Sequence, residues 1–449
     1  MRNSPATVPL CCPAAARRRL LQSALAAALA GLVPGRARAR EDVVRIGYLG
    51  PLSGPVAAWG QPGLDGSRLW ADWVNAAGGL QIGQRRLQVE IRAFDDEYDP
   101  ALARIGAGRL IRREGVSLLM MLGGDSWPGA AQVVSETGML ATTLMPSDLS
   151  PETQTLIAPA EVHPIYNVTG VDWLARNRPW LKSAVICAQD DVFGLPSIAT
   201  YVAAFRAAGI TLTDEPLLFD PATRDFAPLV RRMLAGSGGA GSGGAGIGGQ
   251  RPDIVCLDTC YPDYILPICE ELHRQGFAGQ ILSCTLDFHD RIIARTSPDF
   301  LEGAIFQFPD FDDPALASGA VNFQDPARFH AEYEVRFPGS WSSVSWQYAA
   351  VLDLWKAAAE AAGSVAPEAV LAALKSGAEL AHVFGPARWW GAELFGIPNA
   401  LVGNWPVVEI TGGRARIREF VSVPDWYDRH GPLLHEEMAR YGQLWSQRS

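Results

Sequence analysis

Several of the short motifs that mark enzymes are missing from this sequence of 449 residues. It contains no G-x-S-x-G nucleophile elbow and no H-E-x-x-H motif, and no G-x-G-x-x-G fingerprint follows the first strand-like segment. The seven histidines are scattered without the spacing of metal ligands. These absences argue against a hydrolase, a metalloenzyme and a dinucleotide-binding enzyme. We therefore expect no catalytic residue, no metal site and no cofactor.

Positive charge is also scarce, because 38 Lys and Arg face 48 Asp and Glu. Arg17, Arg18 and Arg19 precede an uncharged apolar stretch at 20–33, and Ala37 and Ala39 offer the small residues that a signal peptidase cuts. Cleavage there would remove six arginines and no acid, which takes the net charge from −10 to −16. We expect residues 1–39 to be a Sec or Tat export signal and the mature protein to be periplasmic. Neither nucleic acid nor an anionic membrane is expected as a partner.

Long apolar runs are absent beyond residue 39, since none reaches the roughly 18 residues that a membrane-spanning helix needs. The mature protein is therefore expected to be soluble. A chain of this length exceeds what one hydrophobic core supports, which predicts two lobes.

Cysteines are few, and those beyond the export signal fall within one part of the sequence. Cys187, Cys256 and Cys284 each sit in an apolar strand-like run, where burial as a small hydrophobe is expected. Cys260 and Cys269 flank a predicted helix start and are the better disulfide candidates. No histidine lies at ligand spacing beside them, so this group does not predict a metal site.

Short strand-like runs alternate with longer helical segments along the chain, which predicts parallel strands with right-handed crossovers. Two such series in tandem predict an α/β protein with two doubly wound parallel-sheet lobes. A Gly/Ser tract at 236–249 lies within the second series, between a predicted helix and the predicted strand 253–257. It indicates a flexible surface insertion and not a phosphate loop, because no Gly-Lys-Ser/Thr follows it. Predicted strands are 44–49, 87–94, 116–121, 139–143, 183–187, 211–219, 253–257, 280–284, 303–308, 407–410 and 416–421. Predicted helices are 62–77, 99–114, 129–137, 166–177, 195–208, 225–234, 264–275, 326–337, 342–361 and 367–375.

Ligands of doubly wound sheets bind at the carboxyl ends of the strands. Ser126 and Ser147 follow two predicted strands, and each could cap the next helix while it presents hydroxyl and N–H groups to an anion. A simple turn or N-cap serine is an equally weighted alternative. The acidic pairs Asp95-Asp96 and Asp190-Asp191 occupy similar ends, where we favour solvated loop carboxylates over an acid/base pair.

The sequence resembles the leucine/isoleucine/valine-type (type I) periplasmic binding proteins of ABC importers. The resemblance rests on the order of matches along nearly the whole mature chain: VRIGYLGPLSGPVAAWG near the start, Asn75 to Gly79 closing a helix, AQDDVFG at 188–194, SWQYAAVLDLWKAA at 345–358 and the Thr411-Gly412-Gly413 turn. It implies two lobes that close around a ligand and are joined by three crossovers. Lobe 1 is expected at 43–164 and 312–385, lobe 2 at 165–311 and 386–425, and a C-terminal tail at 426–449.

The resemblance also implies ligand-binding residues. The loop serine for the ligand carboxylate corresponds to Ser126, with Gly124 as the alternative, and the second carboxylate turn leaves Ser147 as its hydroxyl. A covering aromatic corresponds to Phe193, a second falls at Cys260 or Tyr261, and the acid for a ligand ammonium falls near Asp287. Trp127 beside the anion loop and Trp59 after the first turn depart from the amino-acid pattern and could face the cleft.

These features predict a monomeric binding protein that captures an amino acid or a related small carboxylate or amide for a membrane permease and catalyses nothing. Two other classes stay open at this point. One is a ligand sensor of the same fold, and the other is a periplasmic α/β hydrolase that uses the acidic pairs.

Overall fold

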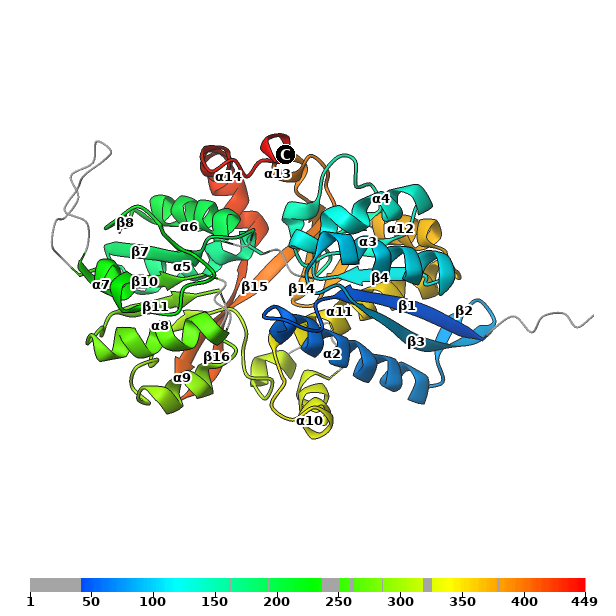
Figure 1. Ribbon diagram of the computed structural model, residues 1–449, viewed down its shortest axis with the longest axis horizontal. Helices are drawn as coiled ribbons and strands as arrows, with labels where there is room; N and C mark the ends of the chain where they lie inside the picture. Colours follow the sequence, from blue (N-terminus) through cyan, green and yellow to red (C-terminus); the bar gives the residue numbers. More distant parts are fainter. Residues whose placement is uncertain are drawn as a thin grey trace, which may run out of the picture. The chain divides into compact units, whose positions relative to one another are not determined.

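The computed structural model describes residues 42–160, 163–192, 194–235, 251–258, 262–284, 286–317, 325–377 and 380–448. The proposed export signal, the Gly/Ser tract and the predicted site residues Phe193 and Tyr261 lie outside these ranges. Within them the chain forms two sheets flanked by helices, which confirms the predicted α/β class with two lobes (Figure 1).

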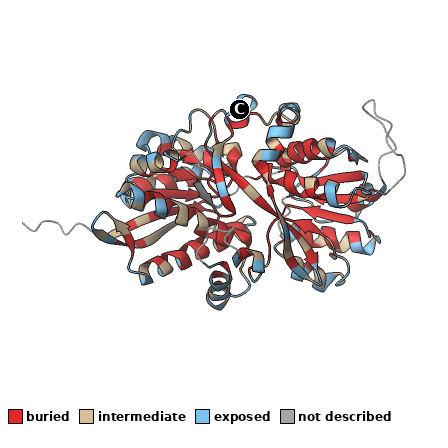
Figure 2. Cartoon of the chain, turned by 180° about the vertical axis from the view of Figure 1, so that it is seen from behind, coloured by how far each residue is buried: buried red, intermediate tan, exposed pale blue. Residues whose placement is uncertain are grey.

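The first sheet is the core of lobe 1. Its strand order is β2-β3-β1-β4-β5-β6, and all neighbours are parallel except the β2–β3 hairpin. The central strands β1 and β4 are apolar along most of their length because helices cover both faces of the sheet, and Figure 2 shows this buried layer. The strands are β1 (Val43–Gly50), β2 (Leu80–Ile82), β3 (Arg85–Asp95), β4 (Leu118–Met121), β5 (Ala141–Thr142) and β6 (Leu156–Ile157).

Helices α2 and α11 pack closely together in lobe 1, although they lie far apart in the sequence. A Cβ atom on Gly66 of α2 would lie 2.0 Å from the carbonyl oxygen of Ser345 in α11, so the absence of a side chain there sets the helix separation. Helices α3 and α4 pack against each other, and a turn of π-helix (Arg109–Arg113) extends α3. The helices of this lobe are α2 (Ala57–Ala76), α3 (Pro100–Gly108), α4 (Trp127–Thr137), α10 (Pro326–Arg336), α11 (Ser343–Ala362) and α12 (Pro367–Lys375).

The second sheet is the core of lobe 2. Strands β8, β7, β10, β11 and β12 are parallel in that order, and β15 pairs with β12 in the antiparallel direction. The strands are β7 (Ser183–Gln189), β8 (Thr211–Leu212), β9 (Leu217–Phe219), β10 (Ile254–Leu257), β11 (Gln280–Ser283) and β12 (Ile305–Phe306). The helices are α5 (Val168–Asn177), α6 (Gly194–Ala208), α7 (Ala227–Ala235), α8 (Pro262–Arg274) and α9 (His289–Arg295).

The chain passes between the lobes three times: after β6, after β12 and along β15. The first residues of β15 pair with β14 and adjoin Ala158 of lobe 1, whereas its later residues pair with β12 and β16 of lobe 2 (Figure 1). These passages confirm the expected crossovers. The remaining elements are β13 (Leu380–His382), β14 (Gly385–Trp390), α13 (Ala392–Phe395), β15 (Ala400–Thr411), β16 (Arg414–Ser422) and α14 (Val423–Arg440).

Three details differ from the sequence predictions. Asn399 donates to the carbonyl of Leu156 at 2.8 Å, so the segment that leads into β15 contacts lobe 1, although residues from 386 on were expected in lobe 2. Residues 423–440 form α14, which packs on α6, whereas residues from 426 on were expected to form a tail. Cys269 is a buried free thiol, so naming it a disulfide candidate was wrong, and the other candidate, Cys260, lies outside the described ranges.

Among the helices that the structure describes, none alone is long and apolar enough to cross a membrane. Helices α11 and α12 pass that test only as a pair, and they meet at a bend of 99°.

Candidate functional site

The loop after β4 brings backbone N–H groups to the end of the first sheet. Gly123 has φ 92°, and a Cβ atom there would lie 2.1 Å from both the Thr143 hydroxyl and the Asp148 carboxyl. Glycine therefore allows the loop to approach Asp148 closely. The Gly124 N–H donates to both carboxyl oxygens of Asp148 at 3.1 Å, and the Thr143 hydroxyl donates to Oδ2 at 2.6 Å. A carboxylate of the protein itself thus occupies a donor of the predicted anion loop.

Asp148 has an unusual environment for an acid. Burial raises the pKa of its carboxyl to about 7, against the opposing effects of the Thr143 hydroxyl, the Gly124 N–H and the positive charge of Arg448. The Asp148 carboxyl is therefore divided between its neutral and ionised forms near neutral pH.

Arg448 comes from the C-terminal end of the chain to this loop. Its guanidinium donates to the carbonyl of Ser147, and to the carbonyl of Leu394 at 3.4 Å. Its Nε–H group is buried and has no hydrogen-bond partner among the described residues. The segment that follows α14 therefore supplies a cation beside the predicted anion loop.

A cavity of about 950 Å³ lies where this loop meets lobe 2. Lobe 1 lines it with Gly124, Trp127 and Ser147, among others, lobe 2 lines it with residues 190–192, 195 and 196, and the segment after α14 forms a further wall. The lobes touch here, because a Cβ atom on Gly124 would lie 3.3 Å from a methyl group of Val192. The volume is within the range that small-molecule sites of proteins have.

Acids dominate the charge of this cavity. Asp125 of lobe 1 and Asp190 of lobe 2 line it with exposed side chains, and Asp148 and Asp191 line it as well. Partial desolvation of the Asp125 carboxyl raises its pKa, although the residue is exposed by surface area. The basic residue among the described lining residues is Arg448. The cavity therefore offers sites for positive charge and one guanidinium for a negative group.

Of the predicted site residues, Trp127 and Ser147 line this cavity. Ser126 lies deeper and is 1% exposed. It occupies the N-cap position of α4, but its side chain makes no capping hydrogen bond, so the predicted cap by its hydroxyl is wrong. The Ser126 hydroxyl lies instead against Asp96, whose pKa is raised by burial and lowered by the Tyr98 N–H and by Ser126.

Asp287 lies elsewhere, in a second cavity of about 560 Å³. Its carboxylate accepts the N–H and the hydroxyl of Ser343, each at 2.8 Å, at the N-terminus of α11. Asp287 follows β11 of lobe 2 and Ser343 begins a helix of lobe 1, so this pair joins the lobes. Burial raises the pKa of Asp287, and its two bonds to Ser343 oppose that effect.

Trp59 forms another contact between the lobes. It is 7% exposed, and its ring centroid lies 6.4 Å from that of Phe288. Trp59 thus packs beside Phe288, the residue after Asp287, and is not among the residues that line the cavity of Trp127.

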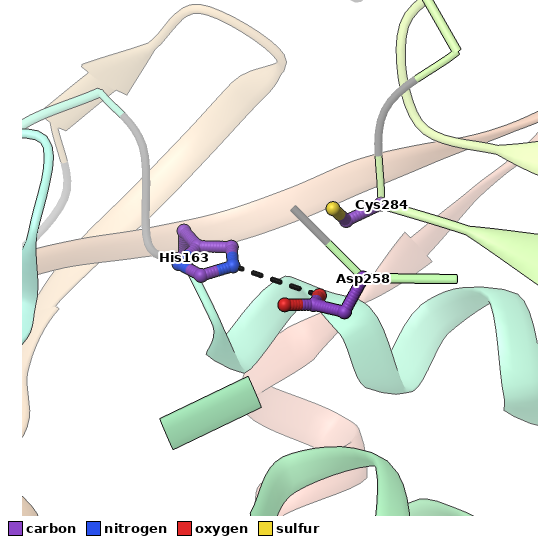
Figure 3. Close-up of side chains that lie close together, drawn as sticks. All are labelled: His163, Asp258 and Cys284. Carbon is purple, nitrogen blue, oxygen red and sulfur yellow. Dashed lines mark ion pairs between the residues drawn. The ribbon is translucent and has the colours of Figure 1, made fainter. Parts of the chain in front are cut away.

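A buried polar cluster lies at the ends of β10 and β11 (Figure 3). It consists of His163, Asp258 and Cys284, whose potential metal-ligand atoms all lie within 4.8 Å of one another. The His163 Nε2 atom lies 2.7 Å from the Ser197 hydroxyl and 3.8 Å from the Asp258 carboxylate. Asn167 donates to the same carboxylate oxygen at 3.2 Å. The cluster therefore ties the segment before α5 to the strands of lobe 2.

Asp148, Arg448 and the cluster of His163, Asp258 and Cys284 were not predicted as site residues from the sequence. Asp148 adjoins the predicted Ser147, and its place at a strand end was a usable signal. Arg448 and His163 reach their sites from distant parts of the chain, for which spacing gives no signal.

The sequence is similar to known binding proteins. The sequence profile of a family described as periplasmic binding protein matches residues 43–414. A stretch of 115 residues is 30% identical to the leucine-specific-binding protein of Salmonella typhimurium. That stretch covers 25% of this chain and 29% of the relative, so the alignment spans less than a third of the relative's length.

Solved structures share the fold. A leucine binding protein from Thermotoga maritima gives a TM-score of 0.64 at 15% identity, with 85% of this chain and 100% of that chain covered. A solute binding protein of an ABC transporter from R. palustris, in complex with benzoate, gives a TM-score of 0.65 at 15% identity, with 85% and 96% covered. At these identities the likeness concerns the architecture.

Proposed function

Because the chain belongs to the periplasmic binding protein family, we propose that it is the solute-binding component of an ABC importer and that it catalyses no reaction. The observation that carries this proposal is the cavity of about 950 Å³ lined by both lobes, at the strand ends where doubly wound sheets bind ligands. A ligand that contacts both lobes favours the closed arrangement, and a membrane permease can recognise that arrangement.

The charges that line the cavity support a zwitterionic ligand. Arg448 offers a guanidinium for a carboxylate, and Asp125 and Asp190 offer carboxylates for an ammonium group from opposite lobes. A free amino acid carries both charges, whereas benzoate carries only the negative one. We therefore favour an amino acid over an aromatic acid as the solute.

The predicted site residues have different places in this proposal. Trp127 and Ser147 contact the solute in the cavity, and the buried Ser126 supports the loop after β4. Asp287 and Trp59 stabilise the contact between the lobes, through Ser343 and Phe288. Phe193 and Tyr261 stay as proposed contacts from lobe 2.

Calorimetric titration of the mature chain with amino acids, their N-acetyl forms and benzoate tests the ligand class. N-acetylation removes the ammonium charge, so we expect it to lower the affinity at least tenfold, which corresponds to about 1.4 kcal/mol. The Asp190→Asn substitution should lower the affinity for the free amino acid several-fold and leave binding of the N-acetyl form unchanged.

Asp299→Asn is the matched control, because Asp299 is exposed and does not line the cavity. It should leave every affinity unchanged. Equal affinity for free and N-acetylated amino acids would refute the zwitterion. A solute that is recovered chemically changed after incubation with the pure protein would favour the hydrolase instead.

A further inference from the structure

We propose that His163, Asp258 and Cys284 bind a divalent transition-metal ion, for which Zn²⁺ is the best chemical fit. The proposal does not rest on the solute, because His163, Asp258 and Cys284 are not among the residues that line the cavity of about 950 Å³. The sequence predicted no metal site, since His163 is distant in sequence from the other two ligands and no ligand spacing is present.

The sheet register places two of the ligands side by side. Strands β10 and β11 are parallel, with Leu257 opposite Ser283 as their last paired residues. Asp258 and Cys284 are the next residues of each strand, so their side chains emerge from neighbouring positions on the same face of the sheet. His163 reaches them from the segment that enters lobe 2, and the three side chains point toward one another (Figure 3).

The donor set suits a borderline-soft cation. An imidazole nitrogen, a thiolate and a carboxylate oxygen are the three ligand types that Zn²⁺ takes in proteins, at about 2.0 to 2.3 Å. Tetrahedral coordination places such ligand atoms roughly 3.3 to 3.8 Å apart. The 3.8 Å from His163 Nε2 to the Asp258 carboxylate fits this spacing, and the remaining separations of up to 4.8 Å require only small movements of side chains.

Burial is a second argument. Asp258 and Cys284 are 0% exposed and His163 is 3% exposed. A carboxylate in such a place is costly unless a cation or a metal ion compensates its charge. On binding, the Cys284 thiol releases its proton to solvent and the thiolate coordinates the ion, so two negative ligands neutralise a divalent charge.

One hydrogen bond of the cluster fits an outer layer of a metal site. The Asn167 amide donates to the Asp258 carboxylate at 3.2 Å, and such partners orient metal ligands in proteins. The Ser197 hydroxyl lies 2.7 Å from His163 Nε2, the nitrogen that faces Asp258, so this contact gives way when that nitrogen coordinates the ion. A hydrogen-bonded cluster without any ion is the competing interpretation, and metal binding separates the two.

The test uses the full mature chain after removal of metal with a chelator. Titration with Zn²⁺ against a chromophoric chelator should reach one ion per chain with a dissociation constant below about 1 µM. Titration with Co²⁺ should give the ultraviolet charge-transfer band of a thiolate–cobalt bond together with the visible bands of a tetrahedral site.

The Cys284→Ser substitution should abolish the charge-transfer band and weaken Zn²⁺ binding at least a hundredfold. His163→Gln and Asp258→Asn should each weaken it at least tenfold. Cys269→Ser is the matched control, because Cys269 is also a buried free thiol but lies on α8 and is not part of the cluster. It should leave the band and the affinity unchanged.

The unsubstituted chain keeps the test decisive even if a variant fails to fold. Absence of stoichiometric Zn²⁺ and Co²⁺ binding by the unsubstituted protein would overturn the proposal. A cobalt spectrum without a thiolate band, or a band that persists in Cys284→Ser, would overturn it as well. Neither result bears on the solute, whose binding is measured separately.

Discussion

Asp287 allows a sharp test of how the lobes are held together. Its carboxylate accepts two hydrogen bonds of 2.8 Å from Ser343, at the N-terminus of a helix in the other lobe. Loss of a capping acceptor costs about 0.5 to 2 kcal/mol, and hydrogen bonds to a charged group contribute about 1.5 to 3 kcal/mol. We therefore expect Asp287→Ala to destabilise the contact between the lobes by about 2 kcal/mol, which is a factor of about 30 in its equilibrium constant.

A solute that bridges the lobes binds through this contact, so its affinity should fall by up to that factor. Calorimetry with two probes, leucine and benzoate, shows whether the loss depends on the charge of the solute. We expect the same proportional loss for whichever probes bind, because Ser343 and not the solute is the partner of Asp287. Small-angle scattering of the solute-free variant should show a larger radius of gyration than that of the unsubstituted chain.

Asp325→Ala is the matched control for this experiment. Asp325 caps α10 by accepting the Arg328 N–H at 3.0 Å, and this cap lies within lobe 1. Its loss should lower the stability by about 1 kcal/mol and leave the affinity unchanged. If Asp287→Ala weakened only the ammonium-bearing probe, Asp287 would be a solute ligand and the reasoning about the lobe contact would be refuted.

Two further experiments test the packing and the electrostatics. Gly66→Ala should destabilise the protein by about 1 to 3 kcal/mol in urea unfolding, because the new methyl group meets the backbone of Ser345. The control Gly108→Ala lies in an open helical position and should stabilise the protein by about 0.5 to 1 kcal/mol. Similar effects of both substitutions would contradict the close packing of α2 on α11. The pKa of Asp148 rises from 3.8 to about 7 on folding, so the native state holds a proton that the unfolded state loses above pH 4, and stability should fall as the pH rises from about 4 to 7. Because Asp148 is only partly buried, we expect a loss of about 2 kcal/mol over this window. Asp148→Asn should remove that part of the pH dependence in urea unfolding, and an unaltered profile would show that Asp148 is ionised in the folded protein.

The sequence predicted best those strands that are buried on both faces of a sheet. Central parallel strands such as β4 and β10 are buried on both faces, so they appear as short apolar runs between helical segments. The short strands β2 and β6 and the hairpin of β13 and β14 were missed, because two- to six-residue elements carry little periodicity. Helix α14 was missed because Pro432 interrupts its pattern, although its buried residues include Trp426 and Leu434.

The candidate site was predictable only in part. Ser147 and Trp127 follow strand ends, and topology alone brings such positions together. Arg448 meets Ser147 across 301 residues of sequence, and no local pattern predicts that contact. The same limit applies to His163, because the register of β10 and β11 places Asp258 and Cys284 beside it and spacing along the chain does not.

Reversible capture of a small solute between the lobes can be measured through thermal unfolding of the mature chain with a panel of free amino acids. A solute that binds the native state alone stabilises it by about 2.7 kcal/mol at a concentration of 100 times the dissociation constant. We expect at least one amino acid to raise the unfolding midpoint by several degrees and to be recovered intact. The rise should grow with the logarithm of the amino-acid concentration. No change in the midpoint with any member of the panel at millimolar concentration, or recovery of a chemically altered solute, would contradict reversible capture.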